Sequence, residues 1–209
     1  MTELLDVLNP SGLPTGEIKA RAAVHRDGDL HRTLHLWLVR DGHILLQRRA
    51  CGKDLEPGKL DVAVGGHFRS GETLLEALRE AREELGVTVQ AAELSYLGTF
   101  RATRRYPGVT DDELQESYLL RRDAPLTSYL LDPAEVDVLY ELPLEAATAL
   151  YEHGTPLAAA GFDAHGRRNN ALLIADDLIE QARPAVVARL RQIQALLAEP
   201  QTLASTDVY

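Results

Sequence analysis

The chain has 209 residues and a hydrophobic share of 45%, which is enough for one globular domain with its own core. Its formal net charge of −10 argues against nucleic acids and anionic membrane surfaces as partners, since both would repel it. One cysteine, Cys51, excludes an internal disulfide, and the absence of an apolar leader or of about 20 consecutive apolar residues predicts a cytoplasmic protein.

The pattern of apolar residues and turn residues predicts an α+β fold. Extended segments are expected at 4–20, as a pair around a turn at 9–12, and then at 34–39, 44–49, 60–64, 87–100, 115–121 and 136–142. The Asp41-Gly42 dipeptide between two apolar runs predicts a tight hairpin. A helix is expected at 144–153, where Gly154 would end it.

The C-terminal part changes character. Two more helices are predicted at 170–182 and 185–198, separated by Pro184, which cannot continue a helix. The second carries an apolar stripe of Val186, Val187, Leu190, Ile193, Leu196 and Leu197. This stripe either covers the core of the same domain or forms a homodimer contact, and the sequence leaves both interpretations open.

The most informative segment is 66–87, GHFRSGETLLEALREAREELGV. Glu80, Glu83 and Glu84 are spaced i, i+3, i+4, so they are neighbours on a helix surface. Such a cluster is either a solvated acidic face paired with arginines or a site for a divalent cation. Mg²⁺ prefers carboxylate oxygens and completes its shell with waters and phosphates.

The same segment has the signals of a short helix. Thr73 and Glu76 have the spacing of a capping box, and Gly86 can supply the left-handed residue that ends the helix. Leu74, Leu78, Ala81 and Leu85 recur at helical spacing and form its predicted buried side. The sequence therefore predicts a loop, one short helix, and a strand that starts near Val87.

The segment resembles the Nudix box, G-x5-E-x7-R-E-U-x-E-E-x-G-U, where U is aliphatic. The matching residues are Gly66, Glu72, Arg79, Glu80, Glu83, Glu84, Gly86 and Val87. Six residues separate Glu72 from Arg79, one fewer than in the family pattern. The resemblance implies a Nudix fold, a mixed curved sheet sandwiched between helices, here with extra C-terminal helices. The domain would span 31–165, between an N-terminal hairpin extension at 1–30 and a helical appendage at 166–209 packed on the same domain.

Outside the box, residues 6–118 resemble one branch of this family, the isopentenyl diphosphate isomerases. The segments AAVHRDGDLHRTLHLWL (22–38), QRRA (47–50), Gly66-His67 and Asp111-Asp112-Glu113 carry the resemblance. It implies a second metal site formed by His25, His31, His67, Asp111 and Glu113. Neutral imidazole suits Zn²⁺ or Mn²⁺, so such a site would weaken below pH ~6. The resemblance also implies that Arg49 and Lys53 hold the substrate diphosphate.

One departure separates the chain from the isomerases. Gly65 stands where they have a catalytic cysteine, and glycine can neither donate nor accept a proton. The resemblance therefore implies hydrolysis of a diphosphate linkage in a small organic or nucleotide substrate, with Mg²⁺, or Mn²⁺ in its place, as cofactor. An isomerase that uses another acid and a non-catalytic diphosphate-binding module are the alternatives.

The expected mechanism divides the roles among few residues. Glu80, Glu83 and Glu84 would hold the metal, which offsets negative charge on the leaving phosphate. A water molecule would attack phosphorus in line, with Glu80 or Glu113 accepting its proton.

Overall fold

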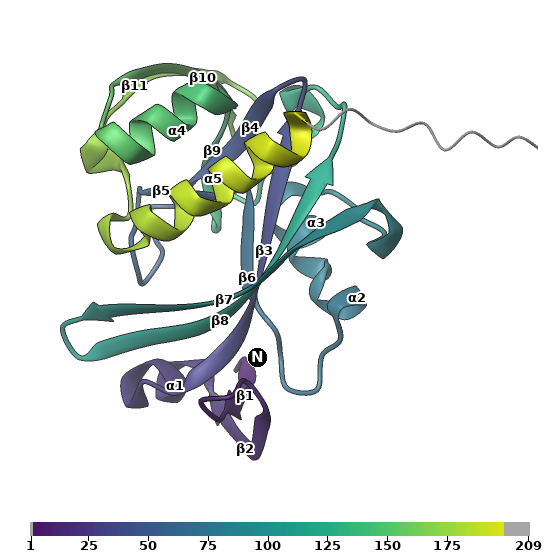
Figure 1. The fold of residues 1–209 in the computed structure, drawn as a ribbon, viewed down its shortest axis with the longest axis vertical. Coiled ribbons are helices and arrows are strands. Elements are labelled where there is room, and N and C mark those ends of the chain that lie inside the picture. The colour runs from purple at the N-terminus through teal and green to yellow at the C-terminus, as the bar shows by residue number, and fades with distance from the viewer. Residues whose placement is uncertain (1, 199–209) are drawn as a thin grey trace, which may run out of the picture.

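The computed structural model describes residues 2–198, which form one mixed sheet with helices on both faces (Figure 1). The strands are β1 (Leu4–Leu8), β2 (Pro14–Ala20), β3 (Leu30–Arg40), β4 (His43–Arg49), β5 (Leu60–Val62), β6 (Val64–His67), β7 (Leu94–Tyr106), β8 (Val109–Arg121), β9 (Val136–Pro143), β10 (Leu157–Asp163) and β11 (Arg168–Leu173). The α-helices are α1 (Arg21–Asp27), α2 (Leu74–Ala77), α3 (Arg79–Leu85), α4 (Leu144–His153) and α5 (Arg183–Ala198). Short 3-10 turns are η1 (Ala91–Glu93), η2 (Leu126–Ser128), η3 (Ala175–Asp177) and η4 (Glu180–Ala182).

Strand β3 organises the sheet. The main strand order is β11-β10-β9-β4-β3-β1-β2, and β8 joins β3 in a parallel pair while β7 continues from β8. Strand β6 pairs with the middle of β3, at 33–36, and β4 pairs with its last residues. One long strand thus connects the N-terminal hairpin, the Nudix-like box and the C-terminal strands (Figure 1).

Helices cover both faces of the sheet, so the central strands are apolar on both sides. On one face Trp37 and Ile44 pack in a cluster with residues of α4 and α5. On the other face Leu36 and Leu45 pack in a second cluster with Ala81 and Leu85 of α3. Alternation along a strand sends successive side chains to opposite clusters. The predicted fold class, a mixed sheet between helices, is confirmed.

Several local predictions are also confirmed. Asp41 and Gly42 both have positive φ, 44° and 72°, as a type I′ hairpin turn requires, and they join β3 to β4. Helix α4 ends at Gly154 and α3 ends at Gly86, both in the left-handed conformation. In α5 the apolar stripe packs on the core, with Leu190 and Ile193 buried. The stripe therefore has a covering role within this chain, and the homodimer contact stays a prediction.

Outside the box segment, two predictions of secondary structure are wrong and one helix was missed. Residues 170–182 form part of β11 and two 3-10 turns instead of a helix. The strand expected from Val87 begins only at Leu94, after η1. Residues 21–27 form a helix that was not predicted, because its N-cap, Ala20, offers no side-chain hydrogen bond as a signal. Among the described residues, no helix is both long and apolar enough to span a membrane.

Candidate active site

The box segment folds as two short helices, not one. Helix α2 begins with the predicted capping box, in which the Thr73 amide donates to Glu76 at 2.8 Å. The helix is interrupted at Leu78, and α3 starts at Arg79. This break accommodates the shortened spacing, because the Arg79 guanidinium still reaches Glu72 Oε1 at 2.7 Å and the His67 carbonyl at 3.1 Å. Arg79 therefore ties the loop, α3 and the end of β6 together.

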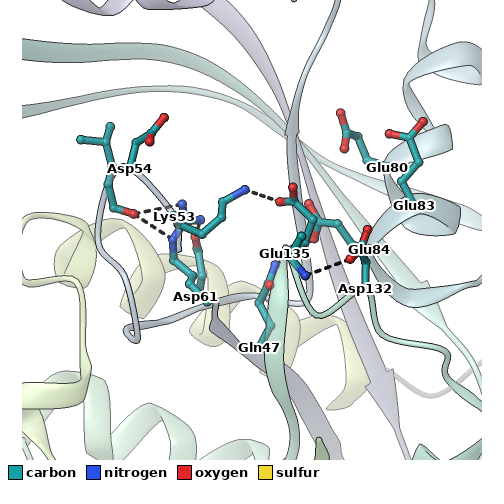
Figure 2. A network of polar contacts seen from close by, with 12 residues as sticks. Gln47, Lys53, Asp54, Asp61, Glu80, Glu83, Glu84, Asp132 and Glu135 are labelled. Carbon is teal, nitrogen blue, oxygen red and sulfur yellow. Dashed lines mark hydrogen bonds and ion pairs between the residues drawn. The ribbon is translucent and has the colours of Figure 1, made fainter. Parts of the chain in front are cut away.

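The three clustered carboxylates have different surroundings. Glu80 pairs with Arg79, and Glu83 accepts a 3.0 Å bond from the same guanidinium while its side chain stays 42% exposed. Glu84 is buried and accepts a hydrogen bond from Gln47 Nε2 at 2.9 Å (Figure 2). Burial raises the pKa of Glu80 to about 7 and that of Glu84 well above its usual range. Carboxylates so placed are stabilised in their charged form by a cation.

The surroundings of Gly66 explain why the motif has glycine at this position. A Cβ built there would lie 2.3 Å from Glu80 Cδ, so only glycine lets the carboxylate lie against β6. The neighbouring Gly65 differs, since its Cβ would meet only Val62 Cγ1 at 3.5 Å. A side chain therefore fits at Gly65 as it stands, whereas at Gly66 it would have to displace the Glu80 carboxylate.

This contrast gives a prediction with a built-in control. We expect Gly66→Ala to displace Glu80 and to weaken Mn²⁺ binding by tenfold or more, a loss within the ~10–100-fold range seen when metal-site geometry is disturbed. Gly65→Ala should leave that affinity unchanged. Isothermal titration calorimetry of both variants checks this, and equal affinities would show that Glu80 does not hold the ion.

The three predicted histidines converge. His25 comes from α1, His31 from β3 and His67 from the end of β6, and their ring centroids lie 5.1–5.3 Å apart. Asp111 Oδ1 lies 3.7 Å from His25 Nε2 and 3.6 Å from His31 Nε2. Strand register explains this, because His31 lies beside Glu113 in the β3–β8 pair and His67 lies beside Thr33 in the β3–β6 pair.

The donor atoms of this cluster fit a metal ion. The Nε2 atoms of all three histidines and Asp111 Oδ1 are buried and have no hydrogen-bond partner within residues 2–198. Buried polar atoms without partners are rare and costly, so several aimed at one point require an explanation. Two sets of three residues here have ligand atoms within 4.8 Å of one another: the three histidines form one set, and His31, Asp111 and Glu113 form the other. Imidazole nitrogens with a carboxylate are a donor set for Zn²⁺ or Mn²⁺.

Arg104 completes this cluster and was not predicted. It lies opposite Asp111 in the β7–β8 hairpin and contacts Asp111 Oδ2 at 2.7 Å and Glu113 Oε2 at 2.8 Å. Asp111 thus directs one oxygen to Arg104 and the other to the histidines. Burial would raise the pKa of Glu113, but Arg104 and His35 lower it below its ordinary value, so Glu113 is held as a carboxylate.

Burial also changes the expected pH behaviour of the histidines. It lowers the pKa of His25 to about 4, with help from the charge of Arg21, and lowers the pKa of His67 well below its usual value. These imidazoles stay neutral, and able to bind metal, at lower pH than free histidine would. The expected loss of metal therefore moves below pH ~6, the value for unperturbed imidazole.

Both clusters line one pocket of about 440 Å³. Its wall also contains Arg49 and Lys53, the cations predicted to bind diphosphate. Each is already paired, since Arg49 donates to Asp61 Oδ2 at 2.9 Å and to the Leu55 carbonyl, and Lys53 contacts Glu135 (Figure 2). Of the other predicted site residues, His31, Glu72 and Gly86 are not part of the pocket wall, which does contain the following: His25, Gly66, His67, Arg79, Glu80, Glu83, Glu84, Asp111 and Glu113.

Several residues that line the pocket were not singled out from the sequence: Glu3, Arg21, Asp61, Arg104, Asp132 and Glu135. Most lie far along the chain from the residues they contact. Gln47 belongs to the segment QRRA, which carries the resemblance, but its contact with Glu84 depends on a neighbour 37 residues away.

Comparison with known proteins agrees with this geometry. A family model described as the NUDIX domain matches residues 29–160. An uncharacterized Nudix hydrolase of Clostridium acetobutylicum is 32% identical over 186 residues, which is 85% of this chain and 90% of that protein. Nudix hydrolase 3 of Arabidopsis thaliana is 37% identical over 150 residues, 68% of this chain but only 19% of the plant protein.

Two further comparisons concern the isopentenyl diphosphate isomerase branch of the family and the fold. An isopentenyl-diphosphate Delta-isomerase of Escherichia coli is 40% identical over 105 residues, covering 49% of this chain and 58% of the enzyme. A crystal structure from Deinococcus radiodurans superposes with a TM-score of 0.61 at 26% identity and covers 91% of this chain and 98% of that one. The chain therefore belongs to the Nudix family, as an enzyme of the Nudix hydrolase type related to the isopentenyl diphosphate isomerases.

Proposed function

We propose that the protein hydrolyses the phosphoanhydride bond of a small organic or nucleotide diphosphate with the help of divalent cations, Mg²⁺ or Mn²⁺. The observation that carries this proposal is the single pocket in which the box carboxylates, the histidine cluster and the paired cations Arg49 and Lys53 meet. A diphosphate needs both fixed cations and metal ions to bind in a pocket this rich in acids.

Two sets of residues would hold the ions. Glu80, Glu83 and Glu84 would hold Mg²⁺ at the box helix, and the cluster of His25, His31, His67, Asp111 and Glu113 would hold a second ion. When bound, such ions neutralise charge on the diphosphate oxygens and lower the pKa of an attacking water. Arg79 positions Glu80 and Glu83, and Gln47 positions Glu84.

The substrate side of the pocket has its own residues. Arg49 and Lys53 would exchange their present partners for non-bridging phosphate oxygens, since a planar guanidinium and a flexible ammonium both suit phosphate. Gln115 Nε2 and Arg104 both bind Glu113 Oε2, which supports a role for Glu113 as a metal ligand rather than as the proton acceptor. An exposed, unpaired Cys51 agrees with the reducing environment of the cytoplasm.

A substrate screen tests the proposal. We would incubate the protein with Mg²⁺ and a nucleoside diphosphate, a nucleotide sugar, coenzyme A and an isoprenoid diphosphate, and follow phosphate or monophosphate release. Metal-dependent hydrolysis of at least one class is the expected result. No release from any class, in protein shown to bind Mg²⁺, would favour a non-catalytic diphosphate-binding module.

We also expect the protein not to interconvert isopentenyl and dimethylallyl diphosphate. Moving a double bond requires a group that donates and accepts protons, and Gly65 has none where the isomerases have cysteine. The space beside Gly65 has room for a Cβ atom, so packing does not explain why a cysteine is absent at this position. Exchange followed by NMR should stay at the rate without enzyme, and a clearly faster rate would establish the isomerase alternative.

A further inference from the structure

The N-terminal hairpin contacts the box loop, residues 68–73 between β6 and α2. Strand β1 and this loop lie side by side (Figure 1) and are joined by three hydrogen bonds. Asp6 Oδ1 accepts from the Ser70 hydroxyl at 2.6 Å, and Asp6 Oδ2 accepts from the Gly71 amide at 2.9 Å. The Leu4 carbonyl accepts from the Ser70 amide at 2.8 Å. The side-chain partners are 64 and 65 residues apart in the chain, so this is a tertiary contact.

The alternation of side chains along β1 directs Asp6 towards the box loop. Its neighbours Leu5 and Val7 are buried in a small cluster with Val24, so the Asp6 side chain projects from the opposite face of the strand. Within residues 2–198 the Asp6 carboxylate forms no ion pair, and the loop uses both of its oxygens. A charged carboxylate is a stronger acceptor for a backbone amide than a neutral oxygen is. The Asp6 side chain therefore stabilises the loop rather than the hairpin.

The box loop depends on such support because its connection to α3 is short and interrupted. Only six residues separate Glu72 from Arg79, and the helix between them stops at Leu78. The two ends are joined instead by side chains, since Arg79 Nε donates to Glu72 Oε1 at 2.7 Å and Arg79 Nη2 to Glu72 Oε2 at 3.2 Å. Gly71 precedes Glu72 and has a left-handed φ of 73°. Anchoring the Gly71 amide to Asp6 therefore fixes the backbone from which the Glu72 side chain extends.

Arg79 connects this contact to the carboxylates of the box helix. It faces Glu72 through Nε and Nη2, and it faces Glu80 and Glu83 through Nη1. A divalent cation at Glu80 and Glu83 must compete with Arg79 for their oxygens. The competition is weaker when Arg79 is held firmly by Glu72, and Glu72 holds it firmly only when the loop is fixed.

We propose that Asp6 is a positioning residue of the box metal site. It anchors the loop so that Glu72 keeps Arg79, and Glu80 and Glu83 stay available to the ion. The proposal rests on the proposed function, in which these glutamates hold Mg²⁺. Asp6 lies outside residues 29–160, which the NUDIX domain model matches, so the hairpin extension takes part in the site.

Variants of Asp6 separate the effect of the hydrogen bonds from that of the charge. Asp6→Ala removes both side-chain bonds and should weaken Mg²⁺ binding about tenfold, the lower end of the range for residues that support metal ligands. Asp6→Asn also loses the charge, but its amide oxygen can accept from Gly71 and its amide nitrogen can donate to the Ser70 hydroxyl. It should therefore bind Mg²⁺ within about twofold of wild type.

Ser70 tests the same contact from the loop side. Ser70→Ala removes one of the two side-chain bonds and should have an Mg²⁺ affinity between those of wild type and Asp6→Ala. The double variant should bind Mg²⁺ no more weakly than Asp6→Ala, because the two side chains share one contact and their effects are not additive.

The measurements distinguish the box from the rest of the molecule. Calorimetric titration with Mg²⁺ reports the box carboxylates, and Zn²⁺ content after dialysis reports the histidine cluster, since Mg²⁺ prefers oxygen ligands and imidazole suits Zn²⁺. Asp6→Ala should keep the Zn²⁺ content and the circular dichroism spectrum of wild type. Half-maximal turnover of Asp6→Ala should need about tenfold more Mg²⁺, with a rate at saturating Mg²⁺ within about threefold of wild type. A general loss of structure would lower both quantities.

Two control variants match the changes at Asp6. Asp163→Ala also removes an aspartate that anchors a turn, since Asp163 Oδ1 accepts from the His165 and Arg167 amides, each at 2.9 Å. Glu152→Gln removes a negative charge from a surface ion pair with Arg191. Neither change should alter Mg²⁺ affinity.

Three results would overturn the positioning role of Asp6. They are an Mg²⁺ affinity of Asp6→Ala within about twofold of wild type, equal losses in Asp6→Ala and Asp6→Asn, and a parallel loss of Zn²⁺ in Asp6→Ala. A wild type that binds Mg²⁺ but hydrolyses no diphosphate would overturn the proposed hydrolysis instead, because the Mg²⁺ titration measures the effect of Asp6 without turnover. A wild type that binds no Mg²⁺ would overturn both.

Discussion

Glu83→Gln and Glu84→Gln should each lower turnover by about 10²-fold or more, the scale of a lost metal ligand, while the fold is retained. Each change removes a charge from the box helix and adds no volume. Glu83 is partly exposed and can approach an ion from solvent, whereas Glu84 is buried against Gln47. Steady-state rates at saturating Mg²⁺ measure the effect, with Glu152→Gln as the matched control.

The stability of Glu84→Gln distinguishes a site residue from a structural one. Burial raises the pKa of Glu84 well above its ordinary range, so its charged form is costly in the metal-free protein. The amide can still accept from Gln47 through its oxygen. We therefore expect Glu84→Gln to unfold in urea, with EDTA present, at a concentration at least as high as wild type. Near-normal turnover in both variants, or lower stability of Glu84→Gln together with its loss of activity, would contradict the metal role.

The parts of the fold that the sequence predicts are those determined by neighbours in the chain. The capping box at Thr73, the terminal glycine Gly86 and the Asp41-Gly42 turn each act over a few residues, and all three are present. The family motif adds positions that chain periodicity cannot supply, such as His25 and His67. Local signals and family motifs together were therefore enough to find the two clusters that we propose as metal sites.

The parts that were missed depend on partners far along the chain. Arg104 meets Asp111 only because β7 and β8 pair in one register, and Glu135 meets Lys53 across 82 residues. Nothing in the sequence near either residue specifies these pairings. Shifting the β7–β8 register by one residue would turn Arg104 to the other face of the hairpin. Such residues follow from tertiary structure alone.

The wrong helix at 170–182 has a similar cause. Ala171, Leu172 and Leu173 can satisfy a helical spacing as well as an extended one, and a short apolar run does not distinguish them. In the structure Leu173 is buried and Leu172 is 65% exposed, the alternation of an edge strand. Pairing with β10 decides the outcome, and this contact is invisible in the segment itself.

His67→Ala should abolish most of the binding of Zn²⁺ or Mn²⁺ at the histidine cluster. The centroids of the three rings lie within 5.3 Å of one another, and metal–nitrogen bonds of about 2.1 Å are compatible with that spacing. Removing one ring leaves His25, His31 and Asp111 with an open position. Metal analysis after dialysis against each ion gives the stoichiometry, and His153→Ala, an exposed histidine on α4, is the control.

The pH at which this metal is lost provides an independent check of the cluster. A histidine ligand must be neutral, and lowering its pKa extends the neutral form to lower pH. Since burial lowers the pKa of His25 to about 4 and that of His67 well below 6.5, protonation competes with metal only under more acidic conditions than for free imidazole. Bound Mn²⁺ should accordingly persist at pH 5.5 and be released as the pH approaches 4. Release centred near pH 6.5, or a metal content in His67→Ala equal to that of wild type, would show that the three buried imidazoles do not hold the ion.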